Sequence, residues 1–406
     1  MIIQKKYFDL LIVGAGPVGS TLANELLKYD RNFKICILEE HKKSGTPQQC
    51  SGLFSKNISD VVELKENEIL QKIKGADLYS PSNFKFSLNT NKIQAYVIDR
   101  TIFDMRLAKQ AKISGAGLLL NTKFLSAKKC KDIYKIKILD KLKNKENTIY
   151  SKYIAACDGA SSIVAKKFNF PKMQCIYGYA IIIKAKTNQD KDFISKNKVA
   201  LYFGEKIAPD FFLWKIPRAK QKTIEIGIAS KKKPQIYLNE FIKRQKINKK
   251  NIIHKMGGLI PCEMRSQIIK NNIILVGDAA GQVKSTTGGG VIYGMKSAKI
   301  AANAIFLALK NNNNALLNNY SFLFNKSLGA ELKKLKFIRN FLNSKKDAQI
   351  DFLIKTLDKK QIKKFIENYG DMDTVSPLIF ELLKHPELWI DFFIVIYKIL
   401  KNYLLK

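Results

Sequence analysis

The sequence contains no closely spaced pair of cysteines. Its six cysteines are scattered along the 406 residues, at Cys36, Cys50, Cys130, Cys157, Cys175 and Cys262. Zinc centres, iron–sulfur clusters and disulfide frameworks need thiols grouped in motifs such as CxxC. The spacing therefore predicts no metal site of these kinds, and it favours a reducing, cytoplasmic location.

Arginine is also scarce. Lysine and arginine together number 71 against 34 acidic residues, giving a net charge of +37, but only seven of the basic residues are arginine. Such a charge attracts nucleic acids, anionic lipids or phosphorylated substrates. Proteins that read nucleic acids group arginine and aromatic residues in a basic motif, and the sequence has no such grouping. We therefore expect no nucleic-acid partner and interpret most lysines as solvated surface.

A long uncharged segment is missing as well. The last apolar stretch, Glu387 to Leu405, has only six residues between Asp391 and Lys398, whereas a membrane-spanning helix needs about 20. Its charged residues fall on one stripe, so we expect this helix to pack inward or to lie on a membrane surface. The apolar start of the chain resembles a signal peptide, but it leads directly into glycines, which predicts a strand and a turn instead.

The first feature that carries chemistry is a strand, turn, helix and strand near the start of the chain. The strands are expected at Phe8 to Val13 and Lys34 to Leu38, and the helix at Pro17 to Tyr29. In a dinucleotide-binding unit, the glycines of the turn permit the tight bend, the approach of a pyrophosphate and close helix packing, and an acid binds the ribose hydroxyls. The residues in these places are Gly14, Gly16, Pro17, Gly19 and Glu39.

The second feature is the segment from residue 277 to residue 294. A buried strand at Ile273 to Val276 leads into the Gly277-Asp278 turn, and an apolar helix is expected to run to Leu309. Three glycines open this helix: Gly288, Gly289 and Gly290. They leave the free N–H groups of the helix N-terminus open to an anionic or electron-rich ligand. The alternative is a flexible loop, but the position between a buried strand and an apolar helix favours a ligand.

The loop from His41 to Ser55 is expected to lie over the cofactor. It ends in Cys50-Ser-Gly52. A free thiol is a liability in an exposed loop, so Cys50 indicates either a functional residue or a small, packed hydrophobic one.

Two further turns contribute candidate residues. Asp99-Arg100 opens a helix, where Arg100 pairs either with Asp104 four residues later or with a phosphate or adenine of the cofactor. A strand ending near Ala156 leads to Asp158-Gly159, which repeats the strand-end acid and glycine of the second feature.

Strand-like segments dominate from Cys175 to Ala229, so we expect a sheet inserted between two cofactor-binding pieces. The predicted fold class is α/β (α+β), with a Rossmann-like domain over 1–170 and 262–312, an antiparallel substrate-binding sheet over 171–261, and a helical C-terminal region over 313–406. Phe212, Trp214 and Ile216 alternate along one strand and share a face. That aromatic face is either core or the wall of an apolar tunnel.

The motifs GAGPVGS, QCSGLFS, DRTIFD, CDGA and GDAAGQVKSTTGGGVIYG follow one another between Phe8 and Asn303. With them, the chain resembles the geranylgeranyl reductase family of flavoproteins. The glycine and acid motifs are shared with a larger group of FAD enzymes related to aromatic hydroxylases. The Cys50 loop and the triple glycine restrict the resemblance to the geranylgeranyl reductase family. The family's Tyr-x-Trp-x-Phe-Pro segment is present with Phe212 in place of Tyr and Ile216 in place of Phe, followed by Pro217.

The resemblance implies bound FAD and stepwise saturation of isoprenoid double bonds, in archaeal-type membrane-lipid precursors or in geranylgeranyl diphosphate. An isolated alkene needs a hydride from reduced flavin and a proton on the adjoining carbon. We expect Cys50 to supply the proton, since apolar surroundings keep a thiol protonated. Tyr293 is the second candidate, with a plain packing role as the alternative. The residues expected to bind FAD are Gly14, Gly16, Pro17, Gly19, Glu39, Cys50, Gly52, Arg100, Asp158, Gly159, Gly277, Asp278, Gly288, Gly289 and Gly290. Those expected to bind substrate are Phe212, Trp214, Ile216 and Pro217.

The expected partners follow from this assignment. No second dinucleotide motif is evident, so we expect an external electron donor: ferredoxin, a flavodoxin-like protein or NAD(P)H. A lipid substrate and the positive charge predict peripheral attachment to the inner face of the cell membrane.

Three alternatives stay open at this point. A flavin-dependent monooxygenase or halogenase shares the glycine and acid motifs. An electron-transfer flavoprotein to quinone reductase should carry a cysteine-rich domain near its C-terminus, yet no cysteine follows Cys262. A basic peripheral protein without catalytic activity would account for the charge and the last helix alone.

Overall fold

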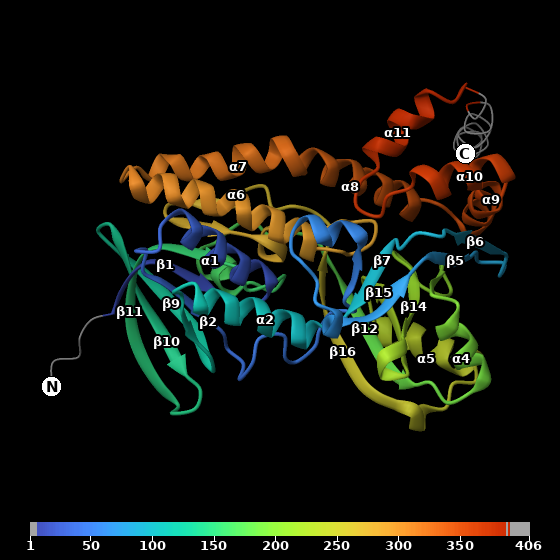
Figure 1. Cartoon of the computed structure of the whole chain (residues 1–406), viewed down its shortest axis with the longest axis horizontal. Helices are drawn as coiled ribbons and strands as arrows, with labels where there is room; N and C mark the ends of the chain where they lie inside the picture. The colour runs from blue at the N-terminus through green and yellow to red at the C-terminus, as the bar shows by residue number, and fades with distance from the viewer. Residues whose placement is uncertain (1–5, 387–388, 390–406) are drawn as a thin grey trace.

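The computed structural model describes residues 6–386 and residue 389, whose helices and strands form three sheets and a helical C-terminal region (Figure 1). The first sheet has the strand order β17-β18-β11-β1-β2-β8, and β9 and β10 extend it through β11. Apolar runs such as Leu10 to Val13 are buried on both faces, as is typical of parallel strands. The strands are β1 (Tyr7–Val13), β2 (Ile35–Leu38), β8 (Gly117–Leu119), β9 (Thr122–Cys130), β10 (Ile133–Asp140), β11 (Lys145–Ala156), β17 (Ile269–Lys270) and β18 (Ile273–Leu275).

Three helices lie along this sheet: α1 (Pro17–Tyr29), α2 (Arg100–Ile113) and α6 (Val291–Lys310). α1 packs against both α2 and α6 (Figure 1). The predicted bounds of α1 are confirmed, but α6 begins at Val291 and not at Gly288. The cause is local, because Gly288 has a φ of 72°, a value that a right-handed helix cannot contain. The glycine run is therefore a loop that leads into the helix.

The second sheet has the order β16-β12-β15-β14-β13-β5-β6 and lies beside the first (Figure 1). Its strands are β5 (Gly75–Tyr79), β6 (Lys85–Asn89), β12 (Cys175–Lys184), β13 (Lys198–Tyr202), β14 (Leu213–Arg218), β15 (Thr223–Ser230) and β16 (Ile252–Pro261). α5 (Pro234–Arg244) packs on one face against β12 and β15, and α4 (Asn188–Ser195) packs against β14. All of its pairs are antiparallel except β13 with β5.

The parallel pairing of β13 with β5 changes the expected domain boundaries of the chain. β5 and β6 belong to residues 75–89, inside the segment assigned to the nucleotide-binding domain, yet they complete the second sheet. Their partner β13 lies more than a hundred residues away in sequence, so local periodicity carries no sign of the pairing. A small third sheet consists of β3 (Leu53–Ser55), β7 (Ala95–Ile98) and β4 (Ile69–Ile73), where β3 and β4 precede β5 in the chain and β7 follows β6.

The C-terminal region is helical, as predicted, and covers both larger sheets from one side (Figure 1). Its main helices are α7 (Asn318–Phe324), α8 (Ala330–Asn343), α9 (Asp347–Leu357), α10 (Lys360–Tyr369) and α11 (Ser376–Leu383). α9 and α10 contact β6. The helix expected over 387–405 falls, apart from Trp389, outside the described residues. Within the described residues, no helix has both the length and the apolar character needed to cross a membrane.

Candidate functional site

The turn after β1 has the shape that a dinucleotide requires. Gly14 has a φ of 102°, and a Cβ there would overlap the carbonyl oxygen of Cys157. A Cβ on Gly19 would overlap the carbonyl oxygen of Gly14. By contrast, a Cβ on Gly16 would meet no atom within 4 Å. Two of the glycines thus serve packing, and the third faces open space at the N-terminus of α1, where a pyrophosphate binds in this motif.

Glu39 lies directly after β2, next to this turn. Its Oε2 accepts a hydrogen bond from the Ala15 N–H at 3.1 Å, and its Oε1 accepts one from the His41 N–H at 3.0 Å. The His41 ring Nδ1 also lies 2.7 Å from Oε1. These contacts hold a largely buried carboxylate in the position that a ribose-binding acid occupies.

Asp158 and Gly159 follow β11 at the same edge of the sheet. Asp158 Oδ2 accepts a hydrogen bond from the Val164 N–H at 3.2 Å, whereas the buried Oδ1 has no partner among the described residues. Burial raises the pKa of this carboxyl. A Cβ on Gly159 would meet no atom within 4 Å. An orphaned buried oxygen beside open space fits a polar group of FAD better than it fits a packed core.

The side chain of Arg100 interacts with the Cys50 loop and with the segment from residue 277 to residue 294. Its Nε and Nη2 each donate to Asp104 at 2.8 Å, so the expected helix-face ion pair is present. Burial lowers the pKa of Arg100, but Asp104 and the Cys50 sulfur raise it more, so the net shift is upward. Cys50 itself is half-buried, and its Sγ accepts a hydrogen bond from the Gly52 N–H at 3.5 Å. The guanidinium therefore faces the thiol as well as the carboxylate.

The same guanidinium acts on Asp278. Burial raises the pKa of Asp278, and Arg100 opposes that shift. A Cβ on Gly290 would overlap Asp278 Oδ1, and a Cβ on Gly288 would lie 3.2 Å from the Ile260 side chain and 3.7 Å from the Phe211 ring. The loop of the glycine run is therefore packed between the Gly277-Asp278 turn and the second sheet. Arg100 interacts electrostatically with the Asp278 carboxyl as well as with Cys50.

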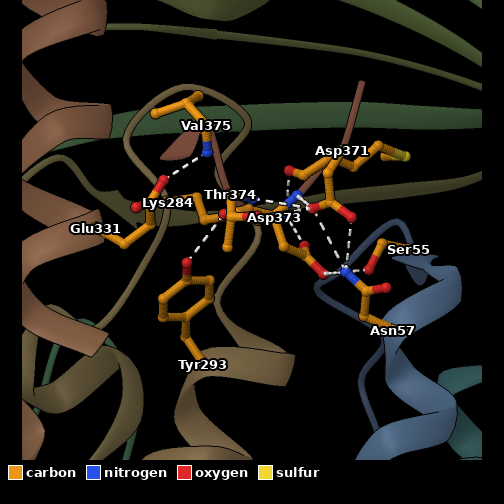
Figure 2. Close-up of polar contacts among 10 residues, drawn as sticks. Ser55, Asn57, Lys284, Tyr293, Glu331, Asp371, Asp373, Thr374 and Val375 are labelled. Atoms are coloured by element: carbon orange, nitrogen blue, oxygen red, sulfur yellow. Dashed lines mark hydrogen bonds and ion pairs between the residues drawn. The ribbon is translucent and has the colours of Figure 1, made fainter. Parts of the chain in front are cut away.

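A turn of the C-terminal region contacts the loop of the glycine run, and sequence reasoning missed it. Figure 2 shows residues 371–375 between Tyr293 and Glu331 on one side and Ser55 and Asn57 on the other. The remaining contacts of the turn come from Lys284, which forms an ion pair with Asp373 and donates to the Met372 carbonyl at 2.9 Å. Lys284 also lies against Gly289, since a Cβ there would come within 2.9 Å of its Cε. An acidic, glycine-led turn is common in solvated loops, so its sequence gave no signal of burial.

Tyr293, the second candidate proton donor, lies in the first turn of α6. Its ring is buried, and its hydroxyl donates to the Asp373 carbonyl at 2.9 Å (Figure 2). Burial raises the pKa of this phenol. The hydroxyl thus holds the C-terminal turn in place, which is the contact of a packing residue.

The aromatic segment forms a wall beside the glycine run. Phe211 and Phe212 stack with ring centroids 4.2 Å apart, and Phe212 meets Trp214 edge to face at 6.2 Å. Phe212, Trp214 and Ile216 pack on the same face of the sheet, opposite Leu213. Pro217 was expected to bind substrate together with these three residues, but it lies on the other face of the sheet. Successive residues of a strand point to opposite sides, so Pro217 lies on the Leu213 face, away from the wall.

Arg339 of α8 is a second residue that the sequence did not reveal. Its guanidinium lies 4.0 Å from the centroid of Phe211 and donates to the carbonyls of Ser285 and Thr286, both at 3.1 Å. Burial lowers the pKa of Arg339 to about 10. An arginine on a lysine-rich helix was the available signal, because guanidinium stacks on aromatic rings better than ammonium does.

The comparisons with known proteins identify the family of the chain. Residues 7–322 match the family described as "FAD binding domain". The chain is 31% identical to digeranylgeranylglycerophospholipid reductase 3 of Methanosphaera stadtmanae over 380 residues, which cover 88% of this chain and 93% of that protein.

Solved structures share the fold. The crystal structure of a geranylgeranyl bacteriochlorophyll reductase-like protein from Thermoplasma acidophilum superposes with a TM-score of 0.81 at 22% identity, covering 96% of this chain and all of that one. The flavin-dependent brominase Bmp2 superposes with a TM-score of 0.68 at 15% identity, covering 94% of this chain and 99% of that one, which is a likeness of fold alone. The open glycine turn and the orphaned Asp158 oxygen fit FAD, the cofactor of the matched family. The chain is therefore an FAD-dependent oxidoreductase and belongs to the geranylgeranyl reductase family.

Proposed function

We propose that this enzyme saturates the carbon–carbon double bonds of geranylgeranyl chains in archaeal-type membrane-lipid precursors, with geranylgeranyl diphosphate as the other candidate substrate. One observation supports the proposal: Arg100 interacts with Cys50 and also electrostatically with Asp278, whose carboxylate packs against Gly290. This favours a common site for the cysteine loop and the triple glycine, the two features that distinguish this family from other FAD enzymes.

Different residues of the site have separate roles in the reduction of an isolated alkene. Bound FAD supplies the hydride once it is reduced. The turn after β1, with Glu39 and Asp158, would hold the nucleotide end of the cofactor, and Asp278 with the glycine run would hold the ring end. The N–H groups of Gly289 and Gly290 would favour negative charge on the ring, whereas the N–H of Gly288 donates to the Lys284 carbonyl at 2.8 Å.

Proton delivery is assigned to Cys50. Its half-buried thiol, in the loop that leads to β3, interacts with Arg100. The π electron pair of the alkene would take the proton of the thiol as hydride arrives on the other carbon. Phe212, Trp214 and Ile216 form the apolar surface against which the chain lies, and they exclude water from the step.

The substrate class comes from chemistry and from the relatives. An apolar wall beside the glycine run suits a long hydrocarbon chain, and a relative at 29% identity is named digeranylgeranylglycerophospholipid reductase. Electrons come from an external donor, either a ferredoxin, a flavodoxin-like protein or NAD(P)H. We also propose that the lysine-rich surface keeps the enzyme at the inner face of the cell membrane, where such lipids reside.

Mass spectrometry of isoprenoid lipids from cells that express the chain tests the proposal. Each saturated bond adds two hydrogens, so the expected result is a series of lipids that differ by two mass units. Cys50→Ala should abolish the series, while Cys130→Ser, which changes an exposed thiol on β9, should leave it intact. Unchanged lipids in the presence of a competent electron donor would refute the assignment. Oxygen-dependent NADPH consumption with an aromatic substrate would support a monooxygenase in its place.

A further inference from the structure

One continuous helix lies along the side of the molecule that the C-terminal region covers (Figure 1). It runs from residue 318 to residue 343 as α7, a π-helical segment over Asn325–Gly329, and α8, and we call it the outer helix. Its buried side chains include Tyr320 and Phe324 in α7 and Leu335 in α8. These residues mark the side that faces the core, so the helical period gives the side that faces solvent.

Two phenylalanines project from the solvent side of the outer helix. Phe322 is two residues away from both Tyr320 and Phe324, and Phe337 is two residues away from Leu335. This spacing places each exposed ring nearly opposite its buried neighbours. Phe322 is 65% exposed and Phe337 is 73% exposed, and the two lie on the order of 20 Å apart along the helix. Large apolar side chains that share one exposed surface indicate an interaction site.

The exposed charges of the outer helix are basic. Lys326, Lys333 and Lys334 are exposed. Lys326 is four residues from Phe322, and Lys333 is four residues from Phe337, so each lies beside a phenylalanine on the same face. The single acid of this helix is Glu331, which is turned toward the C-terminal region and accepts a hydrogen bond from the Val375 N–H at 2.5 Å. The solvent side therefore combines apolar rings with positive charge.

A cavity of about 390 Å³ lies beside the outer helix. Asn325 of the π-helical segment and Lys333 line it from this helix, and Arg265 lines it from the segment after β16. Lys336 is also in the lining, but it forms an ion pair with Glu263 at 2.6 Å. Neither Arg265 nor Lys333 has an ion-pair partner within residues 6–386. Two cationic side chains without acidic partners make the cavity suitable for a phosphate group, and π-helical segments are frequent at functional sites.

The cavity adjoins the loop of the glycine run. Val283 and Ser285 of that loop line the cavity, and a Cβ on Gly290 would lie 2.9 Å from the Val283 side chain. One turn after Lys336, Arg339 contacts the Phe211 ring and donates to the Ser285 carbonyl. The outer helix thus has an exposed side and, on its other side, direct contacts with the aromatic wall and with the loop of the glycine run.

We propose that the outer helix is the surface by which the enzyme binds a bilayer that contains anionic phospholipid. The inference rests on the lipid substrate and the membrane attachment proposed above. Phe322 and Phe337 insert between the headgroups, while the neighbouring lysines lie at the level of the phosphates. The cavity with Arg265 and Lys333 receives the phosphate of one headgroup. A lipid substrate in the same bilayer then lies next to the aromatic wall.

Leu142 provides a matched control. It is 77% exposed and lies between Lys141 and Lys143, in the turn that joins β10 to β11. If one exposed apolar side chain among lysines were enough, this turn would bind a bilayer as well as the outer helix does. The proposal predicts that it does not, because the turn offers one apolar side chain and the outer helix offers two aromatic rings beside a cationic cavity.

Flotation of the FAD-loaded protein with vesicles tests the proposal. Vesicles of phosphatidylglycerol and phosphatidylcholine in equal parts should bind the wild type more tightly than pure phosphatidylcholine does, and raising the salt from about 0.1 M to about 1 M should weaken this binding. The double variant Phe322→Ser, Phe337→Ser should bind roughly tenfold more weakly or worse, and Lys333→Gln roughly fivefold more weakly. Leu142→Ser and Lys141→Gln should bind as the wild type does.

Two further readouts show whether the effect is local. Phe337→Trp should gain fluorescence that lipid brominated on its chains quenches, whereas the added fluorescence of Leu142→Trp should not be quenched. With detergent-dispersed lipid, the double variant should keep the flavin spectrum and the rate of alkene reduction of the wild type. With lipid embedded in vesicles, its rate should fall.

Three results would overturn the inference. They are wild-type vesicle binding by the double variant, equal binding of the wild type to phosphatidylcholine alone, and quenching of Leu142→Trp but not of Phe337→Trp. A dimer in sedimentation velocity that the double variant dissociates would instead assign the outer helix to a second copy of the chain. The proposed function fails separately, if the wild type binds vesicles through this helix yet reduces no alkene with a competent electron donor present.

Discussion

Lys284 and Asp373 form a buried ion pair that joins the loop of the glycine run to the turn between α10 and α11. Their side chains are 6% and 3% exposed, although the two residues lie 89 positions apart. Ser55 and Asn57 also donate to Asp373, so the pair ties the segment after the Cys50 loop to the same turn (Figure 2). Asp373 of the C-terminal region is therefore bound to two other parts of the chain, the loop of the glycine run and the segment after the Cys50 loop.

Breaking this pair should destabilise the protein strongly. Asp373→Asn leaves the Lys284 ammonium buried without its counter-charge, and such a loss typically costs about 3–5 kcal/mol of unfolding free energy. Urea unfolding followed by circular dichroism measures it. Glu25→Gln breaks the exposed Lys28–Glu25 pair and serves as the control, with an expected loss of less than about 1 kcal/mol. Equal losses for the two variants would contradict the role given to Asp373.

The same pair predicts how stability depends on pH. Burial raises the pKa of Asp373, but Lys284, Ser55 and Asn57 outweigh burial, so the net shift is downward. A carboxyl with a lowered pKa contributes stability that is fully present above its unfolded-state pKa of about 3.9 and is lost as pH falls through the folded-state value. The stability difference between wild type and Asp373→Asn should therefore be constant near neutral pH and narrow below about pH 4. A difference that stays constant into acid would contradict the shift.

Substitutions of two glycines in the turn after β1 should affect folding and cofactor binding separately. Gly14→Ala places a Cβ on the Cys157 carbonyl at a φ of 102°, so we expect a large loss of stability without FAD. Gly16→Ala meets no protein atom within 4 Å, so the apoprotein should unfold at the wild-type temperature while FAD binds more weakly. Thermal unfolding with and without added FAD measures both effects. Normal FAD affinity in Gly16→Ala would show that the open space does not hold the cofactor.

Tyr293→Phe should distinguish a packing role from proton donation. The change removes the hydrogen bond to the Asp373 carbonyl, which is worth about 1 kcal/mol. We expect a loss of that size in unfolding free energy and a rate of alkene reduction close to that of the wild type. A large loss of rate at unchanged stability would assign the proton to Tyr293 and take it from Cys50.

The sequence by itself determined the parts whose signals are local. The bounds of α1 followed from apolar periodicity and Pro17, and the strand, glycine turn and acid from Gly14 to Glu39 were predictable because their spacing is set by one βαβ unit. The family was equally accessible, since its motifs are contiguous segments that keep their order.

Only the tertiary structure decided which distant segments meet. β5 pairs with β13 in the second sheet, Asp373 reaches Lys284, and Glu225 accepts a hydrogen bond from Trp214. The segments that meet have common local sequence patterns: a hairpin, a polar turn and a strand with one acidic residue. Pairing across a sheet and burial of a charge depend on the free energy of the whole assembled core, so no short stretch of the chain contains the information that fixes them.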